Sequence, residues 1–202
     1  YSYYQKAAML MARNGMMALV YDCIGQGERL SYLKGSSNAG LQHKLDNVNA
    51  ILVGRTAVGY QAWDGIRAAD YLLSRPELDR SKPLGMTGNS GGGAQTMYLM
   101  ALDDRIGPAA QSCHITTLER NFELGGAGDG CQSPPLTGAL GIDHPDFFVM
   151  RAPRPSIILS AERDYKDIVF TRKTYAETQK AYSLLDRPEC MVMFAYDDTH
   201  SF

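Results

Sequence analysis

The sequence predicts one domain of the α/β class, with a mainly parallel sheet flanked by helices. Short apolar runs of strand length alternate with longer segments whose apolar residues recur at helical spacing. A glycine-rich turn at residues 88–93 joins one such run directly to a helical segment. Strands that alternate with helices form βαβ units, and the sheet of such units is mainly parallel.

The individual elements follow from local patterns. The apolar run MMALVY, residues 16–21, has the composition of a strand that is buried on both faces of a sheet. Residues 118–144 are rich in glycine and proline, so we expect an insertion that shapes a site rather than the core. The expected elements are, in order, a helix at 5–13, a strand at 16–21, a loop at 25–41, a helix at 59–74, a strand at 84–87, the turn at 88–93, a helix at 94–102, strands at 106–113 and 156–160, a helix at 172–184 and a strand at 191–196.

Composition and charge exclude several classes of function. The 202 residues carry 20 basic and 22 acidic side chains mixed along the chain, for a net charge of -2. This balance gives no electrostatic reason to expect nucleic acid or an anionic membrane as partner. No apolar run approaches the ~20 residues that cross a bilayer. We therefore expect a small-molecule or oligosaccharide substrate.

The four cysteines give little sign of a metal site. Cys23, Cys113, Cys131 and Cys190 lie far apart, without a C-x-x-C pair and without histidine at zinc-ligand spacing. The sequence therefore predicts no metal. A disulfide between Cys113 and Cys131 is compatible with the sequence, but spacing alone does not establish it.

One motif carries clear chemistry. Residues 88–92, GNSGG, match G-x-S-x-G and stand between an apolar strand and a helix. A sharp turn at this place lifts the hydroxyl of Ser90 above the sheet edge, and the flanking glycines let strand and helix approach each other. Ser90 is the predicted nucleophile, and the N–H of Gly91 is the predicted oxyanion donor.

A serine nucleophile needs a base and an acid that orients it. His200 follows the last predicted strand, and Asp164 is the first carboxylate after the strand at 156–160. These positions match the order serine, acid, histidine that accompanies the motif. We predict Asp164 and His200 as partners of Ser90. The alternative acids are Asp143, Asp146, Asp167, Asp197 and Asp198, which are better explained as loop or cap residues.

The remaining candidates concern substrate binding. His114 directly follows a predicted strand, and it is expected with Glu119 to contact substrate, as Tyr32 and the insertion could also do. The stretch DCIGQGE after residue 21 has glycines behind a strand but lacks G-x-G-x-x-G spacing and a following helix. A nucleotide site is therefore not predicted.

Several blocks together resemble the acetyl xylan esterase-like branch of the α/β hydrolases, which is near the glucuronoyl-esterase-like enzymes. The blocks are YDCIGQGER, GYQAWDGIRAADYLLSRPELD, GMTGNSGGG, APRPSIILSAERD and DDTHSF. The resemblance implies the α/β-hydrolase fold, a carbohydrate esterase that removes acetyl groups from xylan or its oligosaccharides, and no cofactor. It places Ser90, Asp164 and His200 in the triad and the Gly91 N–H in the oxyanion hole.

Two features depart from this family. The family has earlier strands, with a loop that supplies a second oxyanion donor, and a closing helix after the histidine. These elements have no counterpart here. We therefore expect residues 1–202 to be one domain that is incomplete at both ends. Two alternatives to a deacetylase stay open, namely a glucuronoyl methyl esterase or peptidase with the same triad, and a non-catalytic binding protein of this fold.

Overall fold

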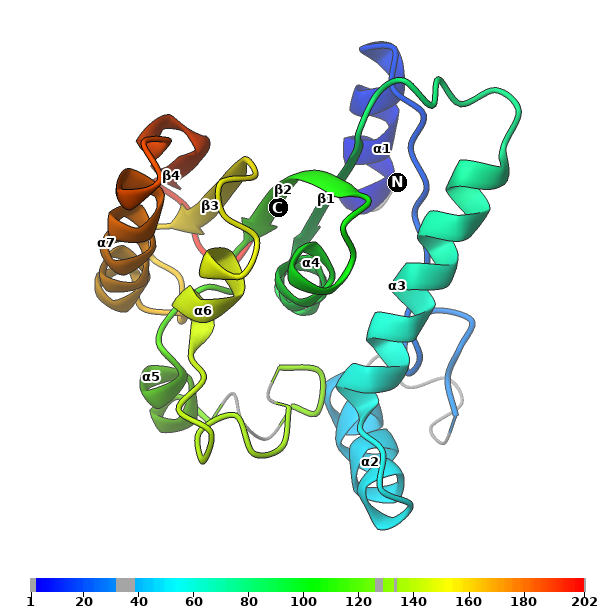
Figure 1. The fold of residues 1–202 in the computed structure, drawn as a ribbon. Coiled ribbons are helices and arrows are strands. Elements are labelled where there is room, and N and C mark those ends of the chain that lie inside the picture. The colour runs from blue at the N-terminus through cyan, green and yellow to red at the C-terminus, as the bar shows by residue number, and fades with distance from the viewer. Residues whose placement is uncertain (1–2, 32–38, 126–128, 133, 202) are drawn as a thin grey trace.

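The computed structural model describes residues 3–31, 39–125, 129–132 and 134–201 of the chain. Within these residues the centre is a sheet of four parallel strands in the order β1-β2-β3-β4 (Figure 1). The strands are β1 (Leu84–Asn89), β2 (Ile106–Ser112), β3 (Ser156–Ala161) and β4 (Met191–Tyr196). Sequential strands are neighbours throughout, and the parallel α/β architecture expected from the sequence is confirmed.

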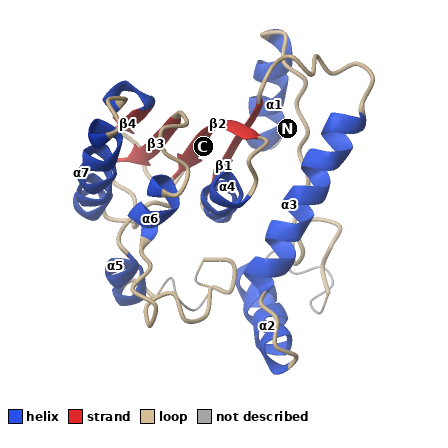
Figure 2. Ribbon diagram, in the orientation of Figure 1, coloured by secondary structure: helices blue, strands red, loops and turns tan. Residues whose placement is uncertain are grey.

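Helices pack on this sheet in layers (Figure 2). α4 packs against β1 and β2, α7 packs against β3 and β4, and α6 contacts both helices. α3 packs on α4, and α2 packs on α3. None of the described helices is long and apolar enough to cross a bilayer. The helices are α1 (Tyr3–Arg13), α2 (Ala39–Leu52), α3 (Ala57–Ser74), α4 (Gly91–Leu102), α5 (Leu118–Glu123), α6 (His144–Val149) and α7 (Ile168–Leu184), with a short 3-10 turn η2 (Pro188–Cys190).

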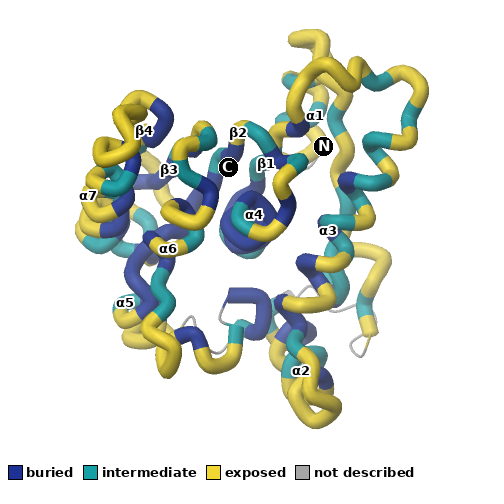
Figure 3. The backbone as a smooth tube through the Cα atoms, viewed as in Figure 1, coloured by how far each residue is buried: buried dark blue, intermediate teal, exposed yellow. Residues whose placement is uncertain are grey.

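The core lies between the sheet and the helices that cover it (Figure 3). α4 is the most enclosed helix, since it has the sheet on one side and α3 on the other, and every residue from Gly93 to Met100 is buried. Phe148 of α6, Ile158 of β3 and Tyr182 of α7 are completely inaccessible to solvent. Burying a large apolar side chain stabilises the fold by roughly 1.5–3 kcal/mol, so this layer fixes the position of the turn before α4.

The strand predicted at 16–21 is wrong. This segment has no regular structure, and Met16 and Val20 are more than half exposed. A strand needs a hydrogen-bonded neighbour, and among the described residues β1 pairs with β2 alone. A cavity separates this segment from β1. Its apolar side chains therefore have no sheet against which to pack. Helices α2, α5 and α6 were also not predicted, and α2 begins inside the loop expected at 25–41.

The four cysteines are free thiols. Cys113 directly follows β2, whereas Cys131 lies in the insertion, and both are buried. The disulfide that the sequence left open is therefore not formed in this structure.

Candidate active site

Ser90 occupies a strained turn between β1 and α4. Its backbone has φ 56° and ψ -115°, a conformation that side chains other than glycine rarely adopt. Its N–H donates to the Ser112 carbonyl at 2.9 Å, which ties the turn to the end of β2. At Gly88 a Cβ atom would lie 2.5 Å from the backbone of Gly92, so only glycine permits this approach of strand and helix. The G-x-S-x-G motif thus forms the predicted elbow.

Gly91 is the first residue of α4. Its N–H is one of the helix N-terminal donors without an acceptor inside the helix, and the aligned peptide dipoles make this end attractive to negative charge. The Ser90 side chain makes no capping hydrogen bond, so its hydroxyl does not compete for these donors. An oxygen that becomes anionic beside Ser90 would meet the Gly91 N–H.

Asp164 and His200 form a hydrogen-bonded pair at the ends of two neighbouring strands. Nδ1 of His200 lies 2.9 Å from Oδ1 of Asp164. Two backbone bonds extend the ladder past β3 and β4, from the Glu162 N–H to the Tyr196 carbonyl at 2.9 Å and from the Arg163 N–H to the Asp198 carbonyl at 3.0 Å. These bonds hold the two loops side by side, which is why residues 36 positions apart meet.

The environment keeps Asp164 ionised. Burial alone would raise the pKa of its carboxyl, but hydrogen bonds with His200, Cys113 and the Lys166 N–H outweigh burial and hold the pKa below its usual value. The carboxyl side chain is only 3% exposed, whereas the imidazole is 24% exposed. The acid is therefore sealed behind the histidine, and the histidine faces solvent.

Tyr165 contacts both Ser90 and His200. Its hydroxyl lies 3.5 Å from Nε2 of His200, and the two rings pack in a tilted arrangement with centroids 4.5 Å apart. The same hydroxyl interacts with the Ser90 side chain. In the described part of the chain no direct hydrogen bond joins Ser90 to His200. Sequence reasoning missed Tyr165, although its place directly after Asp164 was a usable signal.

Cys113 contacts Asp164 and the segment that carries His200. Its thiol donates to the Ser201 carbonyl at 3.3 Å and contacts the Tyr196 hydroxyl at 3.3 Å, and it also interacts with Asp164. Cys113 has a positive φ of 49°, so the chain turns sharply where β2 ends. This cysteine is a second site residue that the sequence did not reveal.

Several solved structures with a similar arrangement of elements carry the names of esterases. A methylesterase is 25% identical with a TM-score of 0.66, over 90% of this chain and 37% of that chain. A putative acetyl xylan esterase from Bacteroides fragilis is 16% identical with a TM-score of 0.77, over 96% of this chain and 50% of that one. A family 15 glucuronoyl esterase from Caldicellulosiruptor kristjansonii is 16% identical with a TM-score of 0.61, over 72% and 46% of the two chains. The chain thus spans half or less of the length of these structures. No protein-family model and no curated protein sequence matches it.

The chain has the α/β-hydrolase fold. This confirms the fold that the sequence resemblance implied, and the neighbours' names are consistent with the resemblance to the acetyl xylan esterase-like branch. Within an α/β-hydrolase fold, the elbow after β1 and the loops after β3 and β4 stand at the carboxyl edge of one parallel sheet. Ligands of open α/β sheets bind at that edge.

The alternative acids have structural roles in this α/β-hydrolase fold. Asp143 and Asp146 form a capping box at the start of α6. Asp167 caps α7 and pairs with Arg120, whereas Asp197 pairs with Arg163 on the surface. Asp198 accepts hydrogen bonds from Thr199 and Ser201. Only Asp164 among these carboxylates contacts His200 in the described contacts.

Two of the residues predicted to bind substrate make no described hydrogen bond with Ser90. His114 is completely buried, and its ring packs against His144 in a tilted arrangement with centroids 5.1 Å apart; burial holds its pKa well below the usual value. Glu119 is exposed on α5. Tyr32 lies outside the described residues. The contacts of His114 and Glu119 with substrate stay predictions without support from their placement.

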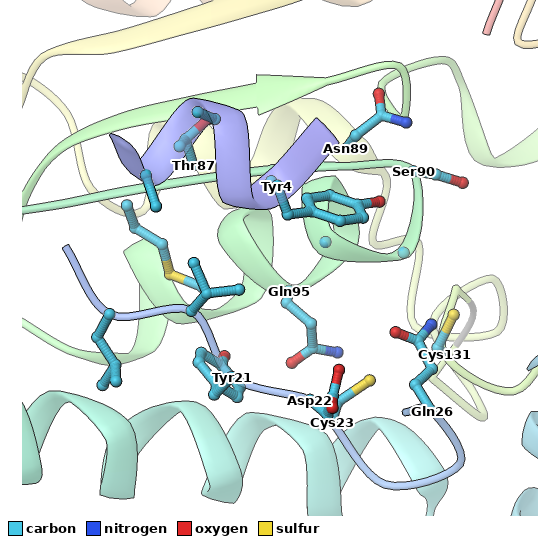
Figure 4. A pocket seen from close by; sticks show the side chains of 18 of the residues that line it. Tyr4, Tyr21, Asp22, Cys23, Gln26, Thr87, Asn89, Ser90, Gln95 and Cys131 are labelled. Carbon is cyan, nitrogen blue, oxygen red and sulfur yellow. The ribbon is translucent and has the colours of Figure 1, made fainter. Parts of the chain in front are cut away.

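A cavity of about 400 Å³ opens beside the elbow. It lies between α1, residues 18–23 and the outer edge of β1, and it reaches Ser90 and Gly91 at one end (Figure 4). Tyr4 from α1 and Gln95 from α4 project toward it, and most of its remaining lining is apolar. A space of this size accommodates a small molecule or a single sugar unit.

Proposed function

We propose that this protein is a serine carboxylic-ester hydrolase that acts on acylated carbohydrate, removing acetyl groups from xylan or its oligosaccharides. One observation supports this most directly: the strained backbone of Ser90 presents a hydroxyl at the same sheet edge where Asp164 orients His200. The names of the structural neighbours support the substrate class, since they include a putative acetyl xylan esterase and glucuronoyl esterases.

The proposed reaction has two steps. Oγ of Ser90 attacks the ester carbonyl carbon while Nε2 of His200 takes the hydroxyl proton, and the departing alcohol then receives that proton. Water next attacks the acyl-enzyme, gives its proton to Nε2 and releases the acid and Ser90. Asp164 holds Nδ1 of His200 as the donor and stabilises the imidazolium in both steps.

Two further groups act on this reaction. The Gly91 N–H, at the positive end of α4, donates to the tetrahedral oxyanion. Tyr165 holds Ser90 and His200 in the resting arrangement, and its side chain is 52% exposed, so it is free to rotate when substrate enters. Direct contact between Oγ and Nε2 then replaces the contacts with Tyr165.

A methyl ester of a uronic acid is the second candidate substrate. Its support is that a methylesterase, and a glucuronoyl esterase in complex with a methyl glucopyranuronate, are among the structural neighbours. The two substrates differ in which side of the ester bond carries the sugar. A panel of acetylated xylo-oligosaccharides and methyl glucuronates, with released acetate and methanol measured separately, distinguishes them.

Labelling with a fluorophosphonate tests the nucleophile itself. We expect one adduct on Ser90, found by intact mass and by mapping of the labelled peptide, and no adduct in Ser90→Ala. Cys190→Ala, a buried change remote from the elbow, is the matched control and should label like the parent protein. A folded protein that stays unlabelled, or is labelled at another residue, would refute the proposal and favour a binding role for this fold.

A further inference from the structure

A second group of histidine, aspartate and cysteine lies on the other side of Ser90. It consists of His43 from α2 and of Asp129 and Cys131 from the insertion. One donor atom of each residue, an imidazole nitrogen, a carboxylate oxygen and the thiol sulfur, lies within 4.8 Å of the other two. Nδ1 of His43 is 3.1 Å from Oδ1 of Asp129. These residues have no part in the proposed hydrolysis.

The group is mostly buried. The side chain of His43 is 3% exposed and Cys131 is 2% exposed, whereas the side chain of Asp129 is 24% exposed. Nε2 of His43 makes no hydrogen bond of normal geometry, although the imidazole interacts with the thiols of Cys131 and Cys23. Nitrogen, carboxylate oxygen and sulfur donors that lie this close together in the interior can hold a metal ion.

The group is poorly placed for nucleophilic catalysis, because Cys131 has almost no exposed surface through which a substrate carbon could reach its sulfur.

We propose that His43, Asp129 and Cys131 bind a divalent transition-metal ion, with zinc as the expected ion. Nitrogen, oxygen and thiolate sulfur are the ligand types that zinc takes in proteins. Tetrahedral zinc places its ligand atoms roughly 3.5 Å apart, given Zn–N of ~2.1 Å and Zn–S of ~2.3 Å. A small contraction of the observed group reaches that spacing. Binding releases two protons to solvent, one from the Cys131 thiol and one from the His43 nitrogen that coordinates the ion.

Cys23 is the expected fourth ligand. Its thiol interacts with the His43 imidazole, as the thiol of Cys131 does. Cys23 and Cys131 also border the same end of the cavity (Figure 4). Three separate segments, namely residues 22–28, α2 and the insertion, would then be tied by one ion. Sequence spacing could not reveal this site because Cys23 and His43 are 20 residues apart and His43 is 86 residues from Asp129.

An ion at this site would fix one wall of the active-site cavity. A Cβ at Gly91 would lie 3.4 Å from Sγ of Cys131, so this cysteine packs against the oxyanion donor. Without the ion, hydrogen bonds hold this wall, including that between His43 and Asp129 and those of Gln132 with Tyr98 and Lys166. The inference stands apart from the proposed hydrolysis, and its test uses metal binding as the readout.

Cobalt(II) substitution tests the site directly. The full chain, stripped with chelator under reducing conditions, is titrated with Co²⁺ and then with Zn²⁺. We expect one Co²⁺ per chain, a thiolate-to-cobalt ultraviolet band, visible bands typical of tetrahedral cobalt, and loss of all these bands when Zn²⁺ is added. The absence of a thiolate band at saturating Co²⁺ in the folded protein would overturn the proposal.

Variants locate the ion. Cys131→Ala and His43→Ala should each weaken zinc binding at least 100-fold, measured by competition with a chromophoric chelator, and Cys23→Ser should weaken it less. Cys190→Ala, another buried cysteine, should bind like the parent protein. Because Cys113, Asp164 and His200 form a similar group, His200→Ala is tested as well: loss of binding there, with binding kept in Cys131→Ala, would refute the assignment. Circular dichroism of each variant separates lost binding from lost folding.

Discussion

Two histidine–aspartate pairs flank Ser90, and their burial is reversed. His200 is 24% exposed and its partner Asp164 only 3%, whereas His43 is 3% exposed and its partner Asp129 24%. Both pairs join Nδ1 to a carboxylate oxygen, at 2.9 and 3.1 Å, and both have a cysteine beside them. A general base must reach substrate, so the exposed imidazole suits catalysis. The sealed imidazole suits a structural role.

The largest expected difference between the pairs is in turnover. His200→Gln should lower kcat/KM on an activated aryl acetate by about 10⁴-fold, because no other group takes the proton of Ser90. Cys190→Ala should keep the parent rate. The measurement is initial rate against substrate concentration for both variants. Turnover that survives in His200→Gln but disappears in His43→Gln would reverse the roles assigned to the two pairs.

The orienting carboxylate should have nearly as large an effect. Asp164→Asn is expected to lower kcat by about 10³- to 10⁴-fold, since an amide does not hold the Nδ1–H tautomer of His200. Asp167→Asn, in the same loop, removes only a helix cap and a surface ion pair. It should lower kcat by less than about threefold. Equal losses in the two variants would show that the loop, and not the carboxylate of Asp164, matters.

Substitution of His43 should destabilise the fold more than substitution of His200. In metal-free protein, His43→Ala should lower the free energy of unfolding by about 3 kcal/mol, because it opens a buried space and leaves Asp129 without its partner. His200→Ala removes a partly exposed ring and opens the Asp164 carboxylate behind it to water, so it should cost about 1 kcal/mol or less. Urea unfolding followed by circular dichroism measures both. A larger loss for His200→Ala would contradict the burial argument.

Lys166 lies between the pairs and gives a smaller, pH-dependent effect. Its ammonium is buried, donates to Asn121 and Gln132, and attracts the carboxylates of both Asp164 and Asp129. Burial nevertheless lowers its pKa from 10.5 to about 8. Between these two values the unfolded chain holds more protons than the folded one, so the Lys166 contribution to the unfolding free energy rises with pH, by roughly 2–3 kcal/mol in all.

The difference between the parent protein and Lys166→Met isolates this effect. We expect the unfolding free energy of the parent protein, minus that of the variant, to rise from pH 8 to pH 10.5. Urea unfolding at each pH measures both values. Other groups that titrate in this range contribute to both curves and cancel in the difference. A difference that stays constant from pH 8 to pH 10.5 would show that the pKa of Lys166 is not shifted in the folded protein.

The sequence predicted most of the sheet and the parts of the candidate site that lie close to motifs. The strands at 84–89 and 191–196 were predictable because apolar runs ended at a glycine turn or at polar loop residues. Residues 16–21 have the same composition but no strand beside them, and strand formation depends on pairing that a local pattern does not contain.

The groups built from distant segments could not be predicted. His43 approaches Asp129 only because α2 packs beside the insertion, and their 86-residue separation leaves no spacing signal. His114 illustrates another limit: a polar residue after a strand was expected to contact substrate, but it is completely buried beside His144 of α6. Local chemistry predicted Ser90, whereas the environment of each histidine required the tertiary structure.

The backbone bonds that continue past β3 and β4 have a mechanical consequence. Because the Glu162 and Arg163 amides are bound to the carbonyls of Tyr196 and Asp198, the loops of Asp164 and His200 behave as one rigid piece. A movement that displaces one of these side chains carries the other along. Ser90 belongs to a different piece, anchored to β2, so thermal motion at this edge changes the gap between nucleophile and base while the charge pair remains assembled.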